Sequence, residues 1–223
     1  FTRDTPDVVF HAAAYKHVPL MENEPDEAAS TNVRGDNNVI EVCERTGVDS
    51  FVLISTDKAV APRNVMGATK AVAERVMLSA ASRGFHATAV RFGNVLGSRG
   101  SVVPIFEDQL QRGGPLKVTH PDVTRYFMTI PEASRLVLQA HALSRGGDVF
   151  VLDMGEPVKI VDLAKRMIVL SGASTEIEFT GLRPGEKMHE ILYANESGLG
   201  PTSCPAVMCL VEPPVVDGVV EER

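Results

Sequence analysis

Residues 50–70 read SFVLISTDKAVAPRNVMGATK, and this stretch decides the fold class. Its opening run, SFVLIS, is almost wholly apolar, which is typical of a strand buried in a parallel sheet. An alanine-rich amphipathic segment follows over residues 66–82 and favours a helix. A buried strand, a polar turn and a helix in this order are typical of an open α/β sheet.

The turn between this strand and this helix concentrates polar side chains. Ser55, Asp57 and Lys58 follow the strand directly. Met66 and Lys70 are i and i+4, so they share one face of the helix. Open α/β sheets bind ligands at the carboxyl ends of their strands. The turn is therefore predicted to form part of a ligand site.

Composition excludes several classes of protein. The chain has 223 residues and a formal net charge of −7, which argues against a general nucleic-acid binder. Its cysteines, Cys43, Cys204 and Cys209, form neither a disulfide framework nor a zinc pattern, so we expect no metal site. No apolar run reaches membrane-spanning length. We expect a reducing, cytoplasmic compartment, with membrane association only if a longer native protein exists.

The rest of the chain alternates strand and helix patterns, as a parallel sheet with crossover helices requires. We expect strands over residues 7–14, 50–55, 86–91, 148–153 and 176–179, with short extended pieces at 117–119 and 126–129. We expect helices over residues 25–46, 66–82, 102–111, 131–144 and 160–171. Residues 15–24 are predicted to form a polar loop.

The active-site stretch resembles that of the extended short-chain dehydrogenase/reductases. Most of that superfamily has a serine followed by Tyr-x-x-x-Lys, and here Met66 stands at the tyrosine position. Ser-Thr-Asp-Lys combined with Met-x-x-x-Lys is similar to one subgroup, the CapD-like UDP-N-acetylglucosamine 4,6-dehydratases of bacterial polysaccharide biosynthesis. The resemblance runs from about residue 6 to about residue 193. It implies an NAD-dependent lyase that acts on a nucleotide sugar.

The resemblance also implies a Rossmann-like doubly wound parallel sheet with a small C-terminal substrate-binding lobe. The strand over residues 7–14 resembles the fourth strand of that sheet, and no glycine-rich phosphate loop follows any strand. Gly93, Gly97 and Gly100 have a tempting spacing, but they follow a later strand. We therefore expect an incomplete sheet that lacks its first strands, through a fragment, a late reading frame or a truncated gene.

Three segments follow from this interpretation. Residues 1–98 are expected to form a partial NAD-binding Rossmann domain that carries the active-site segment. Residues 99–193 are expected to mix the substrate-binding lobe with the remaining Rossmann elements. The proline-rich residues 194–223 are expected to form an irregular or disordered tail.

The family's reaction assigns chemistry to the turn. Loss of water beside a C4 ketone needs a base for the C5 proton and an acid for the C6 hydroxyl. Asp57 resembles the acid and Lys58 the base, with the reverse assignment left open. Met66 cannot accept a proton as tyrosine would, so Thr56 or Asp57 takes that step. Lys70 resembles the lysine that bonds the nicotinamide ribose.

Further residues match family motifs with binding roles. The expected NAD-binding residues are His11, Ala12, Ala13, Asn32, Ser55, Lys70, Arg91 and Gly93. The expected substrate-binding residues are Lys16, His17, Asn94, Ser101, Val103, Arg125, Arg183 and Glu186. The arginines suit a diphosphate because their planar fork matches phosphate oxygens. The partners implied are a UDP-sugar and either a second copy of the chain or a missing N-terminal half.

Two other functions stay open from the sequence. A nucleotide-sugar 4-epimerase shares the superfamily, although such enzymes usually keep the tyrosine and need no acid and base at C5 and C6. A non-catalytic fragment that binds a nucleotide sugar weakly would fit the missing glycine loop.

Overall fold

The computed structural model describes residues 3–194 and 198–213, and the chain forms two compact units. The first unit comprises residues 1–92, 136–153 and 191–223, and the second comprises residues 93–135 and 154–190. Each of them is discontinuous in sequence. The sequence predicts boundaries near residues 98 and 193, with residues 99–193 mixing the lobe and Rossmann elements. In the structure the chain passes between the two units four times.

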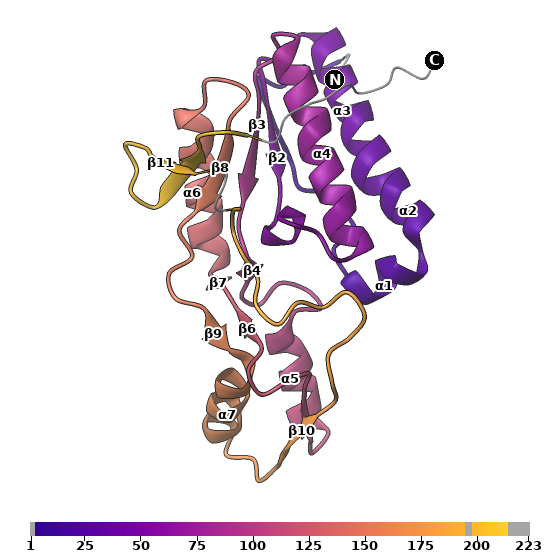
Figure 1. The fold of residues 1–223 in the computed structure, drawn as a ribbon, viewed down its shortest axis with the longest axis vertical. Helices are drawn as coiled ribbons and strands as arrows, with labels where there is room; N and C mark the ends of the chain where they lie inside the picture. The colour runs from indigo at the N-terminus through magenta and orange to yellow at the C-terminus, as the bar shows by residue number, and fades with distance from the viewer. Residues whose placement is uncertain (1–2, 195–197, 214–223) are drawn as a thin grey trace. The chain divides into compact units, whose positions relative to one another are not determined.

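The first unit is built on a six-stranded sheet with the order β1-β2-β3-β8-β12-β11. Its parallel strands are β1 (Val8–His11), β2 (Ser50–Ile54), β3 (Ala87–Arg91) and β8 (Val149–Leu152). This parallel part confirms the predicted Rossmann-like fold class. Helix α3 (Gly35–Thr46) and helix α4 (Val65–Ser82) lie side by side over the sheet (Figure 1).

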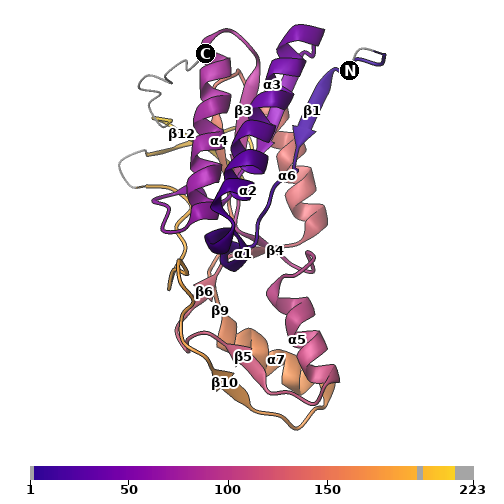
Figure 2. The same ribbon diagram turned by 90° about the vertical axis from the view of Figure 1, so that its right-hand side faces the viewer.

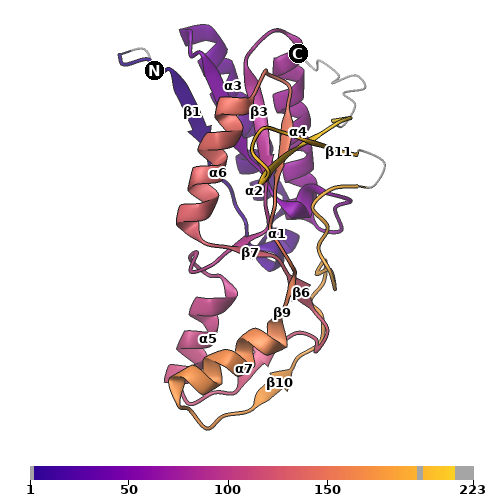
Figure 3. The same cartoon turned by 90° about the vertical axis from the view of Figure 1, so that its left-hand side faces the viewer.

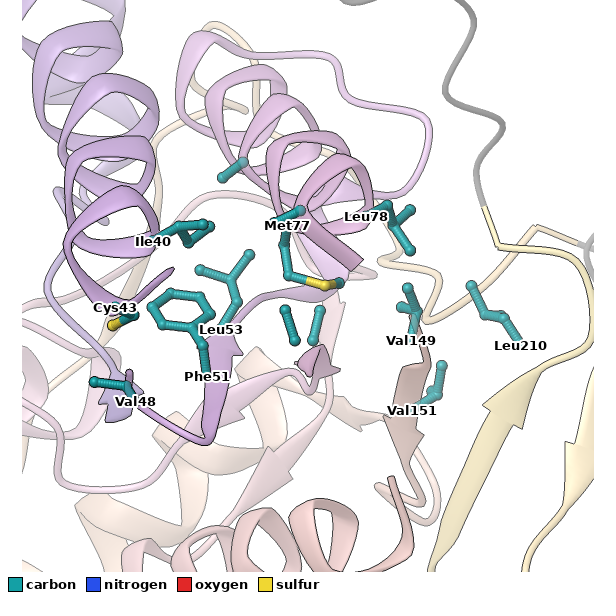
Figure 4. Packing of buried hydrophobic residues seen from close by; sticks show 14 residues of the cluster. Ile40, Cys43, Val48, Phe51, Leu53, Met77, Leu78, Val149, Val151 and Leu210 are labelled. Carbon is teal, nitrogen blue, oxygen red and sulfur yellow. The ribbon is translucent and has the colours of Figure 1, made fainter. Parts of the chain in front are cut away.

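The core of this unit follows from the strand alternation. Phe51 and Leu53 of β2 point to the face that α3 and α4 cover, where Ile40 and Met77 meet them (Figure 4). All four are fully buried, and burial of each such side chain contributes about 1.5–3 kcal/mol. Successive strand residues point to opposite faces, so Val52 faces the other way.

Helix α6 (Ile130–Leu143) lies over the opposite face of this sheet (Figures 2 and 3). The register pairs Phe10 of β1 with Val52, and the ring of Phe10 packs edge-on against His141 of α6 at 5.6 Å. Two helices on one face and one on the other correspond to the doubly wound arrangement that the sequence predicts.

The second unit is a small lobe of short strand pairs and two helices. Its helices are α5 (Val102–Gln111) and α7 (Ile160–Ser171). Its strand pairs are β4 (Asn94–Val95) with β7 (Phe127–Met128), β5 (Leu116–Val118) with β10 (Ile177–Phe179), and β6 (Thr124–Arg125) with β9 (Val158–Lys159). Phe106, Leu116 and Ala164 belong to its separate apolar core.

The expected irregular tail is wrong for residues 198–213. These residues form β11 (Leu199–Pro201) and β12 (Val207–Leu210), and β12 pairs antiparallel with β8. Val207 and Leu210 are buried, and Leu210 belongs to the cluster of Figure 4, so apolar burial fixes this segment despite its prolines. The expected tail at residues 195–197 and 214–223 lies outside the described residues.

The segment after β1 also differs from expectation. The predicted loop at 15–24 contains helix α1 (Val18–Asn23), which has Pro19 in its first turn and is anchored by the buried Met21. The predicted helix over 25–46 divides into α2 (Pro25–Ala29), a π-helical turn η1 (Ser30–Arg34) and α3. Among the described residues, no helix combines the length and apolar character needed to cross a membrane.

Candidate active site

The predicted catalytic turn begins where β2 ends. Ser55 continues the strand pairing, because its backbone N–H donates to the carbonyl oxygen of Val90 at 2.8 Å. Thr56 keeps an extended backbone and caps the single 3₁₀ turn η2 (Asp57–Ala59), accepting a hydrogen bond from the backbone N–H of Lys58. The turn therefore projects from the carboxyl end of the strand, the position expected for a ligand site.

The side chain of Asp57 lies at the centre of this turn and is fully buried. Its Oδ1 accepts hydrogen bonds from Thr56 Oγ1 at 2.7 Å and from Lys58 Nζ at 2.9 Å. Its Oδ2 is buried and has no hydrogen-bond partner in the described part of the chain. A buried carboxylate, a hydroxyl and an ammonium in direct contact can pass a proton among themselves.

Lys16 is brought close to the same turn, although it follows a different strand. Burial lowers the pKa of Lys16, and the positive charge of Lys58 lowers it further. The positive charges of Lys16 and Lys58 therefore repel each other at this turn. His17, the other predicted substrate residue of this segment, is the N-cap of α1.

Helix α4 fixes the turn from the other side. Asn64 caps the helix, because its Oδ1 accepts a hydrogen bond from the backbone N–H of Gly67 at 2.7 Å. Glu22 of α1 accepts from the backbone N–H of Val65 at 2.6 Å, which places an anion at the helix N-terminus. A Cβ at Gly67 would overlap the carbonyl oxygen of Lys58, so only glycine lets the turn pack this closely.

Met66 and Lys70 are both buried on α4, as their shared face predicts. Met66 packs against Met21 and Ala28 in a small apolar cluster, which gives it a packing role. Burial lowers the pKa of Lys70, while the charges of Asp36 and Glu74 act in the opposite direction. Neither acidic residue was singled out from the sequence.

Glu74 joins two predicted cofactor-binding residues beneath the turn. Its Oε1 accepts a hydrogen bond from Ser55 Oγ at 2.5 Å and from Arg91 Nε at 2.8 Å. Its Oε2 accepts from Arg91 Nη2 at 2.6 Å, so the guanidinium is held bidentately. All three side chains are buried. The geometry supports a bracing role for Ser55 and Arg91, and their contact with a cofactor stays a prediction.

Asn32 braces the segment that follows β1. Its side chain accepts from the backbone N–H of Tyr15 at 2.7 Å and donates to the carbonyl oxygen of Tyr15 at 2.9 Å. It also donates to Thr69 Oγ1 of α4 at 3.1 Å. Asn32 was expected to bind NAD; in the structure its side-chain partners lie after β1 and on α4, and its contact with a cofactor stays a prediction. His11 ends β1, and the exposed Ala12 and Ala13 follow it.

The second unit brings together part of the predicted substrate set. Arg125 Nη2 donates to Glu186 Oε1 at 2.9 Å, and Thr119 Oγ1 donates to the same oxygen at 3.0 Å. Glu186 Oε2 accepts from the backbone N–H of Arg183 at 3.1 Å, while the side chain of Arg183 is exposed. Arg125 is buried, so the carboxylate of Glu186 neutralises it.

The remaining predicted residues of this unit lie apart from that pair in sequence. Gly93 and Asn94 are half-buried, and the backbone N–H of Asn94 donates to the carbonyl oxygen of Tyr126 at 3.0 Å. Ser101 is the N-cap of α5, and its Oγ is buried with no hydrogen-bond partner in the described segments. Val103 lies half-buried in the first turn of α5.

The sheet and its polar turn define the class of protein: a Rossmann-type α/β protein of the short-chain dehydrogenase/reductase kind. Comparison with known proteins agrees. The model of the family described as "Polysaccharide biosynthesis protein" matches residues 1–212, and the chain belongs to this family.

Individual relatives match most of this chain. It is 64% identical over 197 residues to the "Probable polysaccharide biosynthesis protein EpsC" of Bacillus subtilis, which covers 86% of this chain and 33% of the relative. It is 62% identical to the "Capsular polysaccharide biosynthesis protein CapD" of Staphylococcus aureus, with the same coverage. The chain therefore spans about a third of the length of these relatives.

A UDP-glucose 4-epimerase of Rickettsia canadensis is 42% identical over 85% of this chain and 57% of its own length.

Among solved structures, Pen from Bacillus thuringiensis has a TM-score of 0.85 at 37% identity, covering 93% of this chain and 66% of its own. A dTDP-glucose 4,6-dehydratase from Streptomyces venezuelae, solved with NAD bound, has a TM-score of 0.77. At 20% identity over 85% of this chain and 65% of its own, it shows the fold alone.

Proposed function

We propose that this chain carries the acid–base turn and the nucleotide-binding lobe of an NAD-dependent 4,6-dehydratase that acts on UDP-N-acetylglucosamine. One observation carries the proposal: the buried carboxylate of Asp57 contacts Lys58 Nζ at 2.9 Å at the carboxyl end of β2. An elimination needs a paired acid and base at this kind of position. The family membership supports the same conclusion.

The proposed elimination uses both members of this pair. The neutral amine of Lys58 takes the C5 proton of the 4-keto sugar, while the carboxyl group of Asp57 protonates the departing C6 hydroxyl. The C5–H and C6–O bonds break, a C5–C6 double bond forms, and one water leaves. The turn is then left as an ammonium and a carboxylate. When the double bond is later reduced, the ammonium group of Lys58 returns a proton to C5 and becomes a neutral amine again. The carboxylate of Asp57 regains its proton from the C4 hydroxyl in the next oxidation.

NAD, when bound, supplies the oxidation at C4 and the later reduction. The described residues fit its nicotinamide-ribose end, since Ala12 and Ala13 after β1 are small and exposed and Lys70 lies on the facing helix. The sequence offers no glycine loop for the pyrophosphate. Thr56 would then hold the sugar near C4, since its hydroxyl already contacts Asp57.

The second unit would bind the nucleotide diphosphate. The side chain of Arg183 is exposed, and Arg125 is held in place by Glu186. Guanidinium groups suit phosphate oxygens. A solved UDP-N-acetylglucosamine 4-epimerase and a UDP-glucose 4-epimerase, both with UDP-linked ligands, share the fold at TM-scores of 0.75 and 0.78. A homo-oligomer or a separate N-terminal partner, and a cytoplasmic location, stay predictions.

The second candidate is a nucleotide-sugar 4-epimerase. The curated relatives named UDP-glucose 4-epimerase, at 42% identity, favour it. The site does not, because Met66 packs in an apolar cluster where a tyrosine base would be expected and because an epimerase has no use for an acid at C6.

Mass spectrometry of the sugar product separates these functions. The chain is incubated with NAD and UDP-N-acetylglucosamine, and ligand binding is measured in parallel by calorimetry. A product lighter by one water supports the dehydratase. A product of unchanged mass whose NMR spectrum shows inversion at C4 supports the epimerase. Binding of the UDP-sugar without NAD binding or turnover would identify a substrate-binding part that needs a glycine loop from elsewhere. Absence of UDP-sugar binding would contradict the proposal.

A further inference from the structure

The carboxylate of Asp36 is fully buried in the first turn of α3, between two basic side chains. Its Oδ1 lies 2.8 Å from His11 Nε2, and its Oδ2 lies 3.6 Å from Lys70 Nζ. The three groups approach at ion-pair distances, but neither carboxylate oxygen gains an aligned hydrogen bond in the described part of the chain. A buried carboxyl group between these two side chains, with neither oxygen in a well-aligned hydrogen bond among the described residues, requires an explanation.

Three separate elements build this cluster. His11 is the last residue of β1, Asp36 follows the π-helical turn η1, and Lys70 lies in α4. Asn32 and Asp36 are four residues apart and both reach α4: Asn32 donates to Thr69, and Asp36 contacts the adjacent Lys70. The segment around η1 is thus fastened to the face of α4 that carries Lys70.

Burial and two neighbouring carboxylates act on the pKa of Lys70 in opposite directions. Burial disfavours an ammonium group, and burial is the largest effect on Lys70, whose pKa it lowers. The negative charge of Asp36 is the largest opposing effect, followed by that of Glu74. Glu74 is already committed to Ser55 and Arg91. Asp36 is therefore the acidic group that is available to balance Lys70.

We propose that Asp36 is a positioning residue for Lys70: its buried carboxylate holds the ammonium group in place and anchors it to His11 at the end of β1. The importance of this role rests on the proposed contact of Lys70 with the cofactor. The cluster itself requires no ligand. The cluster links the end of β1, where a cofactor would pass, to Lys70, the side chain that would bond the cofactor.

The pKa of Lys70 tests the proposal directly. It is measured by NMR in protein labelled with ¹³C at lysine Cε, with the resonance assigned through Lys70→Arg. Asp36→Asn removes the charge with little change of shape and should lower the pKa of Lys70 by about one pH unit or more. Asp36→Glu keeps the charge and should restore most of the shift. Asp49→Asn, at an exposed aspartate, is the matched control and should change nothing.

An unchanged Lys70 pKa in folded Asp36→Asn would overturn the proposal, as would failure of Asp36→Glu to restore it. If Asp36→Asn does not fold, Asp36→Ser removes the same charge with a smaller side chain, and the same two outcomes apply. The titration uses the chain without cofactor or substrate. Failure of the dehydratase assignment would therefore leave this result intact, and the two proposals can fail separately.

Discussion

At the scale of single residues, the turn after β2 was predictable because the side chains that interact there are neighbours in the sequence. Thr56, Asp57 and Lys58 are consecutive, and the structure joins them by direct hydrogen bonds. Lys70 was also found, from its spacing to Met66. Each of these signals needs only a short window of sequence.

The first prediction concerns the acid and the base. Asp57→Asn and Lys58→Ala should each lower turnover at least ~100-fold, because each removes one proton-transfer group. Binding of UDP-N-acetylglucosamine, measured by calorimetry, should be largely retained. The exposed pair Asp162 and Lys165 offers matched controls, and Asp162→Asn and Lys165→Ala should keep full turnover. Near-normal turnover by either turn variant would refute the assignment.

The roles of Asp36 and Glu74 could not be predicted from the sequence, because their partners are distant in the chain. Asp36 contacts His11 and Lys70, which come from two other elements. One sequence feature could have indicated that Glu74 lies near the site: it is at i+4 from Lys70, on the same face of the helix. Nothing local shows that Arg91, from the next strand, points at it.

The second prediction concerns the ion pair beneath the turn. Glu74→Gln leaves the buried guanidinium of Arg91 without its counter-charge, which should lower the free energy of unfolding by about 3–5 kcal/mol. Urea denaturation measures this loss. The control is Glu44→Gln, which breaks the exposed pair with Arg83 and should cost less than about 1 kcal/mol. Equal effects of the two variants would mean that burial of the Glu74 pair has no energetic consequence.

At the scale of elements, the long periodic segments were predictable and the short ones were not. Helix α7 was expected over residues 160–171 and occupies that range, because its apolar periodicity is strong. Helix α1 and strand β12 are short, and prolines flank or start them. Their positions depend on burial of Met21 and Val207, which a local pattern does not reveal.

The third prediction concerns the contact between α4 and the turn. Gly67→Ala should lower both turnover and stability, because the new methyl group meets the carbonyl of Lys58 and displaces the Asp57–Lys58 pair. Turnover assays and thermal melting measure the two effects. Gly35→Ala is the matched helical control, since its Cβ would lie 3.7 Å from the carbonyl oxygen of Ser30, an ordinary van der Waals contact. That variant should be neutral or slightly stabilising. Wild-type turnover in Gly67→Ala would show that the turn tolerates displacement.

The fourth prediction tests whether β12 is part of the core. Leu210→Ala should lower the free energy of unfolding by about 2–5 kcal/mol, the usual cost of truncating a buried leucine. Val211→Ala removes a neighbouring side chain that is 65% exposed and should have little effect. Denaturant titration of both variants provides the comparison. If Leu210→Ala were as stable as Val211→Ala, the C-terminal strand would be dispensable.

At the scale of the whole molecule, the two units carry different parts of the proposed reaction. The first unit holds the acid–base turn, and the second holds the Arg125–Glu186 pair. The sequence predicted this division of roles through family motifs. It also predicted that residues 99–193 would contribute to both units. It did not locate the crossing points, because alternating strands and helices look alike in either unit.

The central claim is that Lys58 and Asp57 exchange protons with the sugar at C5 and C6. The fifth prediction is made for turnover of UDP-N-acetylglucosamine in D₂O with NAD, followed by NMR of the product. The account predicts a 4-keto-6-deoxy sugar that carries solvent deuterium at C5, because the base exchanges its proton with solvent before it is returned. A C4 epimer that retains its C6 hydroxyl and has no deuterium at C5 would contradict the account.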